Sequence, residues 1–89
     1  MAIIWSVHAH ERAIRRGIDP IWAERTVAAP EILEPDPDHP GRLRAYAAIP
    51  EAGCRVLRVV YDPKDGNEVI VTVFLDRKRT RALKGGSSA

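Results

Sequence analysis

Residues 6–18 read Ser-Val-His-Ala-His-Glu-Arg-Ala-Ile-Arg-Arg-Gly-Ile, and this stretch predicts a short helix with a signal at each end. The hydroxyl of Ser6 can accept a hydrogen bond from a free backbone N–H at the helix start. Gly17 can adopt the left-handed conformation that closes a helix without a Cβ clash. The sequence therefore predicts both ends of this helix from local signals alone.

The predicted helix has a basic face and an apolar face, because side chains follow one another at about 100° per residue. The basic arc holds His8, Arg12, Arg15 and Arg16, and the opposite arc holds Val7, Ala9, Ala13 and Ile14. A phosphodiester could lie across the basic arc, beside an imidazole that titrates near neutral pH. The alternative, which the helix alone favours, is an ordinary solvated face. His10 points into the apolar arc, where a buried imidazole is expected.

Length and composition predict one domain. With 89 residues, the chain can bury roughly 60 to 65% of its unfolded surface, and we expect the domain to span residues 1–84. Residues 85–89 read Gly-Gly-Ser-Ser-Ala, which predicts a disordered, linker-like tail. The single Cys54 excludes an internal disulfide, and no Cys/His spacing suits zinc. The cytoplasm is the expected compartment, since no apolar run is long enough for a signal peptide or membrane span.

The formal net charge is only +2, but the charged residues are unevenly distributed. Basic residues gather near the C-terminus at Arg77, Lys78, Arg79, Arg81 and Lys84, whereas acidic residues gather at Glu31, Glu34, Asp36 and Asp38. This layout suits a polyanion on one side of the domain, or a partner that meets both signs of charge.

Further local signals predict a second helix and a turn. Asp19 is a good N-cap for a second helix that ends near Ala29. Because very few residues join it to the first helix, the two are expected to form a helix hairpin. Residues 2–5 and 31–34 are short strand candidates, and the second runs into a stiff turn at 35–41 with three prolines. Asp36, Asp38 and His39 could hold a metal in this turn, but a plain solvated turn is strongly favoured, so no metal site is predicted.

Three strands are predicted from alternating patterns over residues 42–49, 54–61 and 68–75, with a strong hairpin signal at 62–67. One face is expected to carry Leu43, Ala45, Ala47, Ile49, Leu57, Val59, Tyr61, Val69, Val71, Val73 and Leu75, and the other Ile70, Thr72 and Phe74. The predicted fold class is α+β, in two layers. An N-terminal helix hairpin packs on an antiparallel meander of three or four strands.

The sheet face opposite the helices is expected to carry Arg44, Tyr46, Arg58, Thr72 and Phe74, with the basic C-terminal segment leaving from its edge. Arginines there could hold phosphates of single-stranded nucleic acid while aromatic rings stack on bases. The wet face of an ordinary meander is an equally favoured alternative. A register slip by one residue would exchange Arg58 for Arg55.

The order of elements and several phrases resemble a family of small bacterial domains grouped with the BrnT and RelE/ParE-like toxins. The phrases are His8-Ala9-x-x-Arg12-x-x-x-Arg16-Gly17-Ile18, Arg42 followed by Tyr46, Val59-Val60-Tyr61 and Val71-Thr72-Val73, within residues 6–75. The resemblance implies a RelE-like or barnase-like fold. For some members it also implies metal-independent RNA cleavage, with an antitoxin as partner.

Two functional hypotheses follow, and neither needs a cofactor. The first is a toxin-like endoribonuclease that uses the RNA 2′-OH as nucleophile, with RNA and an antitoxin-like protein as partners and no membrane association. Its catalytic residues would be His8 as general base or acid, Arg12 and Arg16 on the scissile phosphate, and Thr72 as a further donor. RNA-binding residues would be Arg15, Arg44, Tyr46, Arg58, Arg77, Arg79 and Arg81. The second hypothesis is a non-catalytic module that holds RNA or a protein on the same surface.

Overall fold

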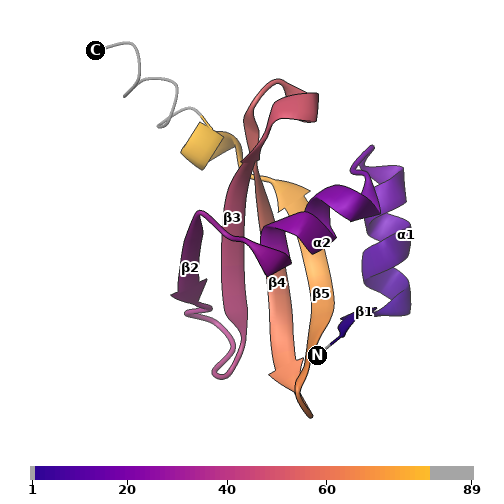
Figure 1. Ribbon diagram of the computed structural model, residues 1–89, viewed down its shortest axis with the longest axis vertical. Coiled ribbons are helices and arrows are strands. Elements are labelled where there is room, and N and C mark those ends of the chain that lie inside the picture. The colour runs from indigo at the N-terminus through magenta and orange to yellow at the C-terminus, as the bar shows by residue number, and fades with distance from the viewer. Residues whose placement is uncertain (1, 81–89) are drawn as a thin grey trace.

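A five-stranded sheet in the order β1-β5-β4-β3-β2 forms the centre of the computed structural model, which describes residues 2–80 (Figure 1). The elements are β1 (Ile3–Trp5), α1 (Val7–Arg15), α2 (Pro20–Ala28), β2 (Ile32–Pro35), β3 (Leu43–Ile49), the 3-10 helix η1 (Pro50–Ala52), β4 (Arg55–Lys64) and β5 (Asn67–Leu75). Strand β1 runs parallel to β5, and the other neighbouring strands are antiparallel. The α+β class is confirmed, and strands β2 to β5 form the expected antiparallel meander, but β1 adds a fifth, parallel strand beside β5 that was not expected.

The helix ends lie where the local signals predicted. The Ser6 side chain accepts a hydrogen bond from the backbone N–H three residues on, at 3.2 Å. Gly17 has a φ of +71°, and the N–H of Ile18 donates to the carbonyl of Ala13 at 2.8 Å, which is the Schellman arrangement. Asp19 caps α2 through the N–H two residues on, at 3.0 Å. These caps set a sharp change of direction between the helices.

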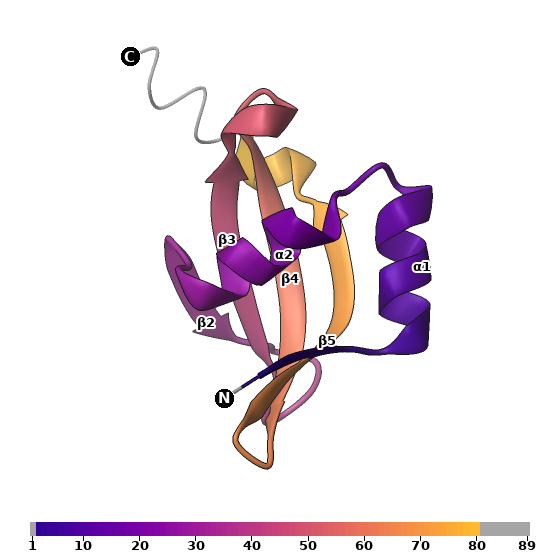
Figure 2. The ribbon, with the colours of Figure 1, turned by 45° about the vertical axis from the view of Figure 1, so that its right-hand side comes forward.

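The two helices pack mainly against different strands, so the expected helix hairpin is wrong. Helix α1 lies beside β5 at the sheet edge, whereas α2 crosses β3 and β4 (Figure 2). Ala9 and Ala13 are the buried residues of α1, and these small side chains allow the helix to approach β5 closely. Val7 and Ile14, expected in the apolar arc, remain exposed. Because α1 lies at the edge, its basic arc can reach the sheet face opposite α2.

The core lies between α2 and one face of the sheet, and the alternation predicted for β3 and β4 is confirmed. In β5 the alternation fails at a β-bulge. Val60 pairs with Thr72 but Tyr61 pairs with Ile70, so Val71 is an extra residue. Ile70 is therefore fully buried in the core, and Val71 lines the opposite face. The period-2 pattern places Val71 on the core face and Ile70 on the other face, and the bulge reverses both.

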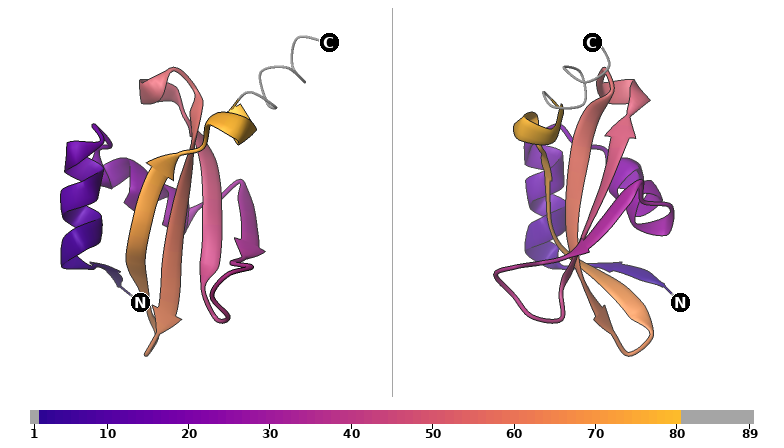
Figure 3. Two further views of the ribbon diagram at one scale, coloured as in Figure 1. Left: turned by 180° about the vertical axis from the view of Figure 1, so that it is seen from behind. Right: turned by 90° about the vertical axis from the view of Figure 1, so that its left-hand side faces the viewer.

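The sheet face opposite α2 is partly covered. The loop between β2 and β3 and residues 77–80, which begin a helical turn, project on this side (Figure 3). Asp76 caps the turn through the Arg79 N–H at 2.9 Å, and the Thr80 hydroxyl accepts from the Val56 N–H at 2.7 Å. Residues 77–80 thus fold back onto the face, contrary to the expectation that the basic segment leaves from its edge. Arg81, Lys84 and the predicted tail at 85–89 lie outside the described residues.

No helix within residues 2–80 is long and apolar enough to cross a membrane.

Candidate functional site

A groove of about 360 Å³ lies on the sheet face opposite α2, between α1 and the β2–β3 loop, and we call it the central groove. Its lining residues are Arg12, Asp36, Asp38, His39, Arg42, Arg44, Arg58, Val60, Val71, Thr72 and Phe74. The four arginines outweigh the two aspartates, which leaves a net charge of +2 when His39 is neutral. The groove therefore attracts anions.

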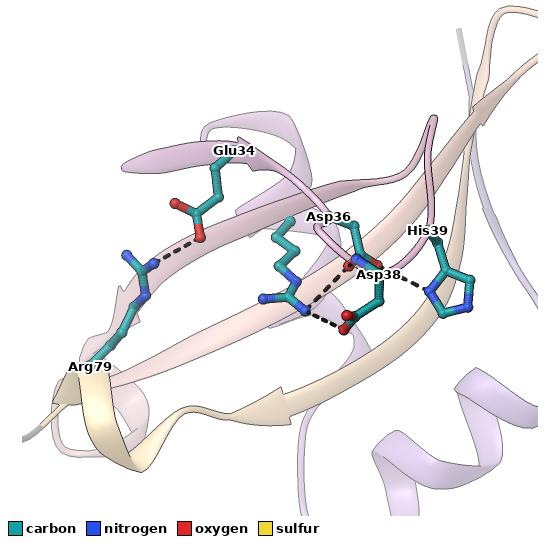
Figure 4. Close-up of polar contacts among 6 residues, drawn as sticks. Glu34, Asp36, Asp38, His39 and Arg79 are labelled. Atoms are coloured by element: carbon teal, nitrogen blue, oxygen red, sulfur yellow. Dashed lines mark hydrogen bonds and ion pairs between the residues drawn. The ribbon is translucent and has the colours of Figure 1, made fainter.

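One wall of the central groove is an ion-pair network in the β2–β3 loop (Figure 4). A nitrogen of Arg44 lies 3.2 Å from Oδ1 of Asp36 and 3.4 Å from Oδ2 of Asp38. Nδ1 of His39 lies 3.5 Å from Oδ2 of Asp36. A hydrogen bond from the Asp38 backbone N–H, aided by the charge of Arg44, holds the pKa of Asp36 below its usual value although the carboxyl is buried. The network therefore holds the side chains of Arg44 and His39 in position at the groove.

The same loop contains the three side chains that the sequence offered as a metal site. Within residues 2–80, no group of three or more acidic, histidine or cysteine side chains converges in a way that could hold a metal ion. Asp36 instead contacts Arg44 and His39, and Asp38 contacts Arg44. These carboxylates therefore position basic groups at the groove.

The floor of the central groove holds an arginine stacked on an aromatic ring. The guanidinium carbon of Arg58 lies 3.9 Å from the centre of the Phe74 ring. The buried Nε atoms of Arg58 and Arg44 have no hydrogen-bond partner within residues 2–80. Arg58 also forms no ion pair with a carboxylate of that part of the chain. The Phe74 ring is therefore the contact that orients this guanidinium at the groove.

The rim carries two further cations, Arg12 from α1 and Arg42 from the loop just before β3. Neither is ion-paired to a carboxylate of residues 2–80. Guanidinium groups present several N–H donors in a planar fork that matches phosphate oxygens, so a phosphate between rim and floor could be bound from several sides.

The structure brings four of the predicted site residues together. Arg12, Arg44, Arg58 and Thr72 come from α1, β3, β4 and β5, and all of them line the central groove. The predicted register of β4 is confirmed, because Arg58 pairs with Phe74 and faces this side.

Other predicted residues of α1 lie elsewhere. His8 and Arg15 are exposed on the helix but do not line the central groove. Arg16 donates from Nη1 to the carbonyl of Val73 at 2.6 Å. Strand β1 ends at its pairing with Ile70, so this carbonyl lies on the part of the β5 edge that β1 no longer covers. Arg16 is therefore part of the support for that edge.

The C-terminal turn uses Tyr46 and Arg79 for packing. Tyr46 is only 1% exposed, and the guanidinium carbon of Arg79 lies 4.0 Å from the centre of its ring. Arg79 also forms an ion pair with Glu34 at 2.8 Å. This corrects the expectation that the ring of Tyr46 is open to a base. Arg77 is exposed beside a second hollow described below.

His10 corrects another expectation. Its side chain is exposed and meets the ring of Trp5 edge-on, with 5.5 Å between the ring centres. Burial on α1 is confined to the Ala9 and Ala13 positions because the helix packs at the sheet edge, so the apolar arc of the helical wheel is too wide.

Sequence reasoning missed His39 and Arg42 because three prolines suggested a plain solvated turn. A signal was nevertheless present in the strand pairing. Glu34 pairs with Arg44 across β2 and β3, and extending this register by two residues places Asp36 opposite Arg42. The Asp36 N–H indeed donates to the Arg42 carbonyl at 2.9 Å. Opposite charges across a strand pair would have indicated an ordered loop.

The fold and the central groove define a small α+β domain with an arginine-rich sheet face. The chain belongs to the family described as "Domain of unknown function (DUF4258)", which it matches over residues 5–75. This range contains every lining residue of the central groove. No curated protein and no solved structure matches the chain.

Proposed function

We propose that the central groove binds the phosphodiester backbone of RNA and that the domain is a metal-independent endoribonuclease. The observation that carries the proposal is the convergence of Arg12, Arg42 and Arg58, none of which forms an ion pair with a carboxylate of residues 2–80. A protein gains no stability from gathering like charges, so such a cluster indicates an anionic ligand. The sheet face is a common platform for single-stranded RNA.

The groove floor suits a nucleotide better than a simple anion. Val60, Val71 and Phe74 supply apolar surface next to the arginines, and the hydroxyl of Thr72 supplies a hydrogen-bond donor and acceptor. Bases stack on arginine planes as well as on aromatic rings, so the Arg58–Phe74 pair can support a base while other arginines hold the phosphate.

The groove also offers an imidazole for proton transfer. Asp36 lies beside Nδ1 of His39, which favours the proton on Nδ1 and leaves Nε2 free to act as a base. We propose that Nε2 takes the proton of the 2′-OH while O2′ attacks phosphorus. The O2′–P bond forms, the P–O5′ bond breaks, and O5′ takes a proton from water. The imidazolium then returns its proton to the hydroxide that remains, which restores the base. The products are a 2′,3′-cyclic phosphate and a 5′-hydroxyl. Arg12 and Arg42, at the rim of the groove, stabilise the charge that develops on the phosphoryl oxygens.

The resemblance to the BrnT and RelE/ParE-like toxins supports the same proposal. From that resemblance we also propose an antitoxin-like protein as partner and the cytosol as the place of action. His8, the imidazole in the quoted helix phrase, is the competing candidate for the catalytic base.

A non-catalytic RNA-binding module is the second candidate function. It is favoured by the exposure of the His39 side chain, which is 60%. An exposed imidazole gains little from the low dielectric constant that strengthens catalytic groups in closed sites.

The test is cleavage of an end-labelled, single-stranded RNA in excess EDTA, with the product ends identified. Wild-type protein should yield 2′,3′-cyclic phosphate ends, and His39→Gln should lower the rate by about 10²- to 10⁴-fold. His10→Ala is the matched control, because His10 is an exposed imidazole outside the groove. If the cleavage rate fell in His8→Ala but not in His39→Gln, the catalytic base would be His8 of α1 and not His39. RNA binding without cleavage would favour the binding module, and absence of both would reject the proposal.

A further inference from the structure

A second hollow of about 340 Å³ lies on the surface next to the central groove. Its lining residues come from three parts of the chain: the residues just after α1, the start of β4, and the end of β5 with the residue that follows Asp76. They are Arg16, Ile18, Arg55, Phe74, Leu75 and Arg77. The hollow contains three arginines and no acidic lining residue. We refer to it as the second hollow.

Two of these arginines are held in place by the backbone. Arg16 donates from Nη1 to the Val73 carbonyl at 2.6 Å, and Arg55 donates from Nε to the Ala52 carbonyl at 2.8 Å. A guanidinium has five N–H donors, so each of these arginines keeps further donors for a ligand. Neutral carbonyls orient these cations but do not neutralise them.

The arginines of the second hollow differ from arginines that stabilise the fold. Arg25 is paired with Glu51 at 2.8 Å, and Arg79 is paired with Glu34 at the same distance. In contrast, the three arginines of the second hollow form no ion pair with a carboxylate of residues 2–80. The chemistry of the second hollow therefore suits an anion.

The two hollows adjoin at one side chain. Phe74 lines both of them, and Arg58 stacks on its ring. On α1, Arg12 lines the central groove and Arg16 lines the second hollow, four residues or about 6 Å further along the helix axis. From the central groove to the second hollow, the surface therefore presents cations, an arginine–aromatic stack, and cations again.

We propose that the second hollow is a subsite for a flanking phosphate of the same strand that occupies the central groove, so that the ligand is a single-stranded RNA spanning both hollows. This inference rests on the proposed function. One phosphate lies among the arginines of the central groove, the adjoining base stacks at Arg58 and Phe74, and a flanking phosphate lies among Arg16, Arg55 and Arg77. A base in this position has left its duplex partner, so the arrangement selects single strands over double strands.

The test compares a ten-nucleotide oligouridine with a uridine dinucleotide by fluorescence anisotropy, using labelled probes with 2′-O-methyl groups that prevent cleavage. The double variant Arg55→Met/Arg77→Met removes two cations of the second hollow and spares Arg16, which supports the β5 edge. We expect it to bind the long probe at least about tenfold more weakly, with the slope of log K against log salt reduced by about 0.7 for each lost phosphate contact. Binding of the dinucleotide should change less than twofold.

The matched control is Arg25→Met/Lys64→Met, which removes the same charge from residues that line neither hollow. It should leave the affinity for both probes within twofold of wild type. Unchanged binding of the long probe by Arg55→Met/Arg77→Met, or equal loss for both probes, would overturn the subsite alone. If wild-type protein bound neither probe, the proposed function would fail together with the subsite. Arg58→Met, which alters the central groove, should weaken both probes and so separates the two cases.

Discussion

Arg58 and Arg79 both stack on aromatic rings of the same sheet face, yet we expect their removal to change stability in opposite directions. Arg58 keeps a buried Nε without a partner within residues 2–80, which costs about 1–3 kcal/mol, while its contact with Phe74 returns about 0.5–2 kcal/mol. Methionine in its place keeps apolar packing and a sulfur–aromatic contact of about 0.3–1.5 kcal/mol. Arg58→Met should therefore raise the free energy of unfolding by about 0.5–2 kcal/mol.

Arg79→Met serves as the comparison. It removes an ion pair with Glu34 worth about 0.2–1 kcal/mol and a cation–π contact with Tyr46 worth about 0.5–1 kcal/mol. Since methionine at this position can also keep a sulfur–aromatic contact with Tyr46, the variant should lose about 0.5 kcal/mol. In a domain of this size each kcal/mol shifts Tm by roughly 4–8 °C, so the opposite shifts are measurable by calorimetry and by urea unfolding.

The effect of Arg58→Met on RNA affinity should be opposite to its effect on stability. Arg58→Met should bind RNA at least about tenfold more weakly, or about 1.4 kcal/mol, although it is the more stable variant. A gain in stability with a loss of binding is the pattern of a residue kept for function. If Arg58→Met proved destabilising by more than 1 kcal/mol with RNA binding unchanged, Arg58 would be a structural residue and the argument would be refuted.

Three further predictions concern single residues. Arg16→Met should lower the free energy of unfolding by about 1–3 kcal/mol in urea titrations, because it leaves the Val73 carbonyl without its donor; a neutral result would contradict the edge-supporting role. His10→Ala should change stability by no more than about 0.5 kcal/mol, since the imidazole is exposed, and a larger loss would show that its contact with Trp5 matters. The lowered pKa of Asp36 stabilises the folded state above the unfolded value of about 3.9, and this contribution is lost as pH falls through the folded pKa. The stability advantage of wild type over Asp36→Asn should therefore be full at pH 7 and shrink below about pH 4; a pH-independent difference would argue against it.

Local features of the fold were predictable because their causes are local. The caps at Ser6 and Asp19 need only residues within a turn of each other. The hairpin between β4 and β5 needs Asp65 and Gly66, which adopt φ of +53° and +78° as a two-residue turn requires. Period-2 patterns likewise gave the inward residues of β3 and β4.

Features that depend on distant pairing were not predictable from these patterns. The parallel pairing of β1 with β5 joins residues more than 60 positions apart in the chain, such as Ile3 and Glu68. The bulge at Val71 changes which residues of β5 face the core, and no residue type in that strand marks it. The position of α1 at the sheet edge depends on the small side chains of Ala9 and Ala13 meeting β5.

The residues of the candidate site likewise fall into those that strand alternation predicts and those that depend on distant contacts. Arg44, Arg58 and Thr72 lie on the predicted face because strand alternation decides it. Tyr46 belongs to the same face, but the turn at residues 77–80 covers it, and its cover depends on the pairing of Arg79 with Glu34. His39 enters the groove through the folded shape of the loop, which periodicity does not describe.

The most direct test of the central claim is a titration of ¹⁵N-labelled protein with a non-cleavable, single-stranded RNA, followed by amide chemical shifts. We predict saturable shifts at Arg44, Arg58 and Thr72, with the amides of α2 unchanged because that helix covers the opposite face. Shifts confined to α2, or none at RNA concentrations near 1 mM, where about 4 kcal/mol of binding energy suffices for half-saturation, would contradict the claim that the central groove binds RNA.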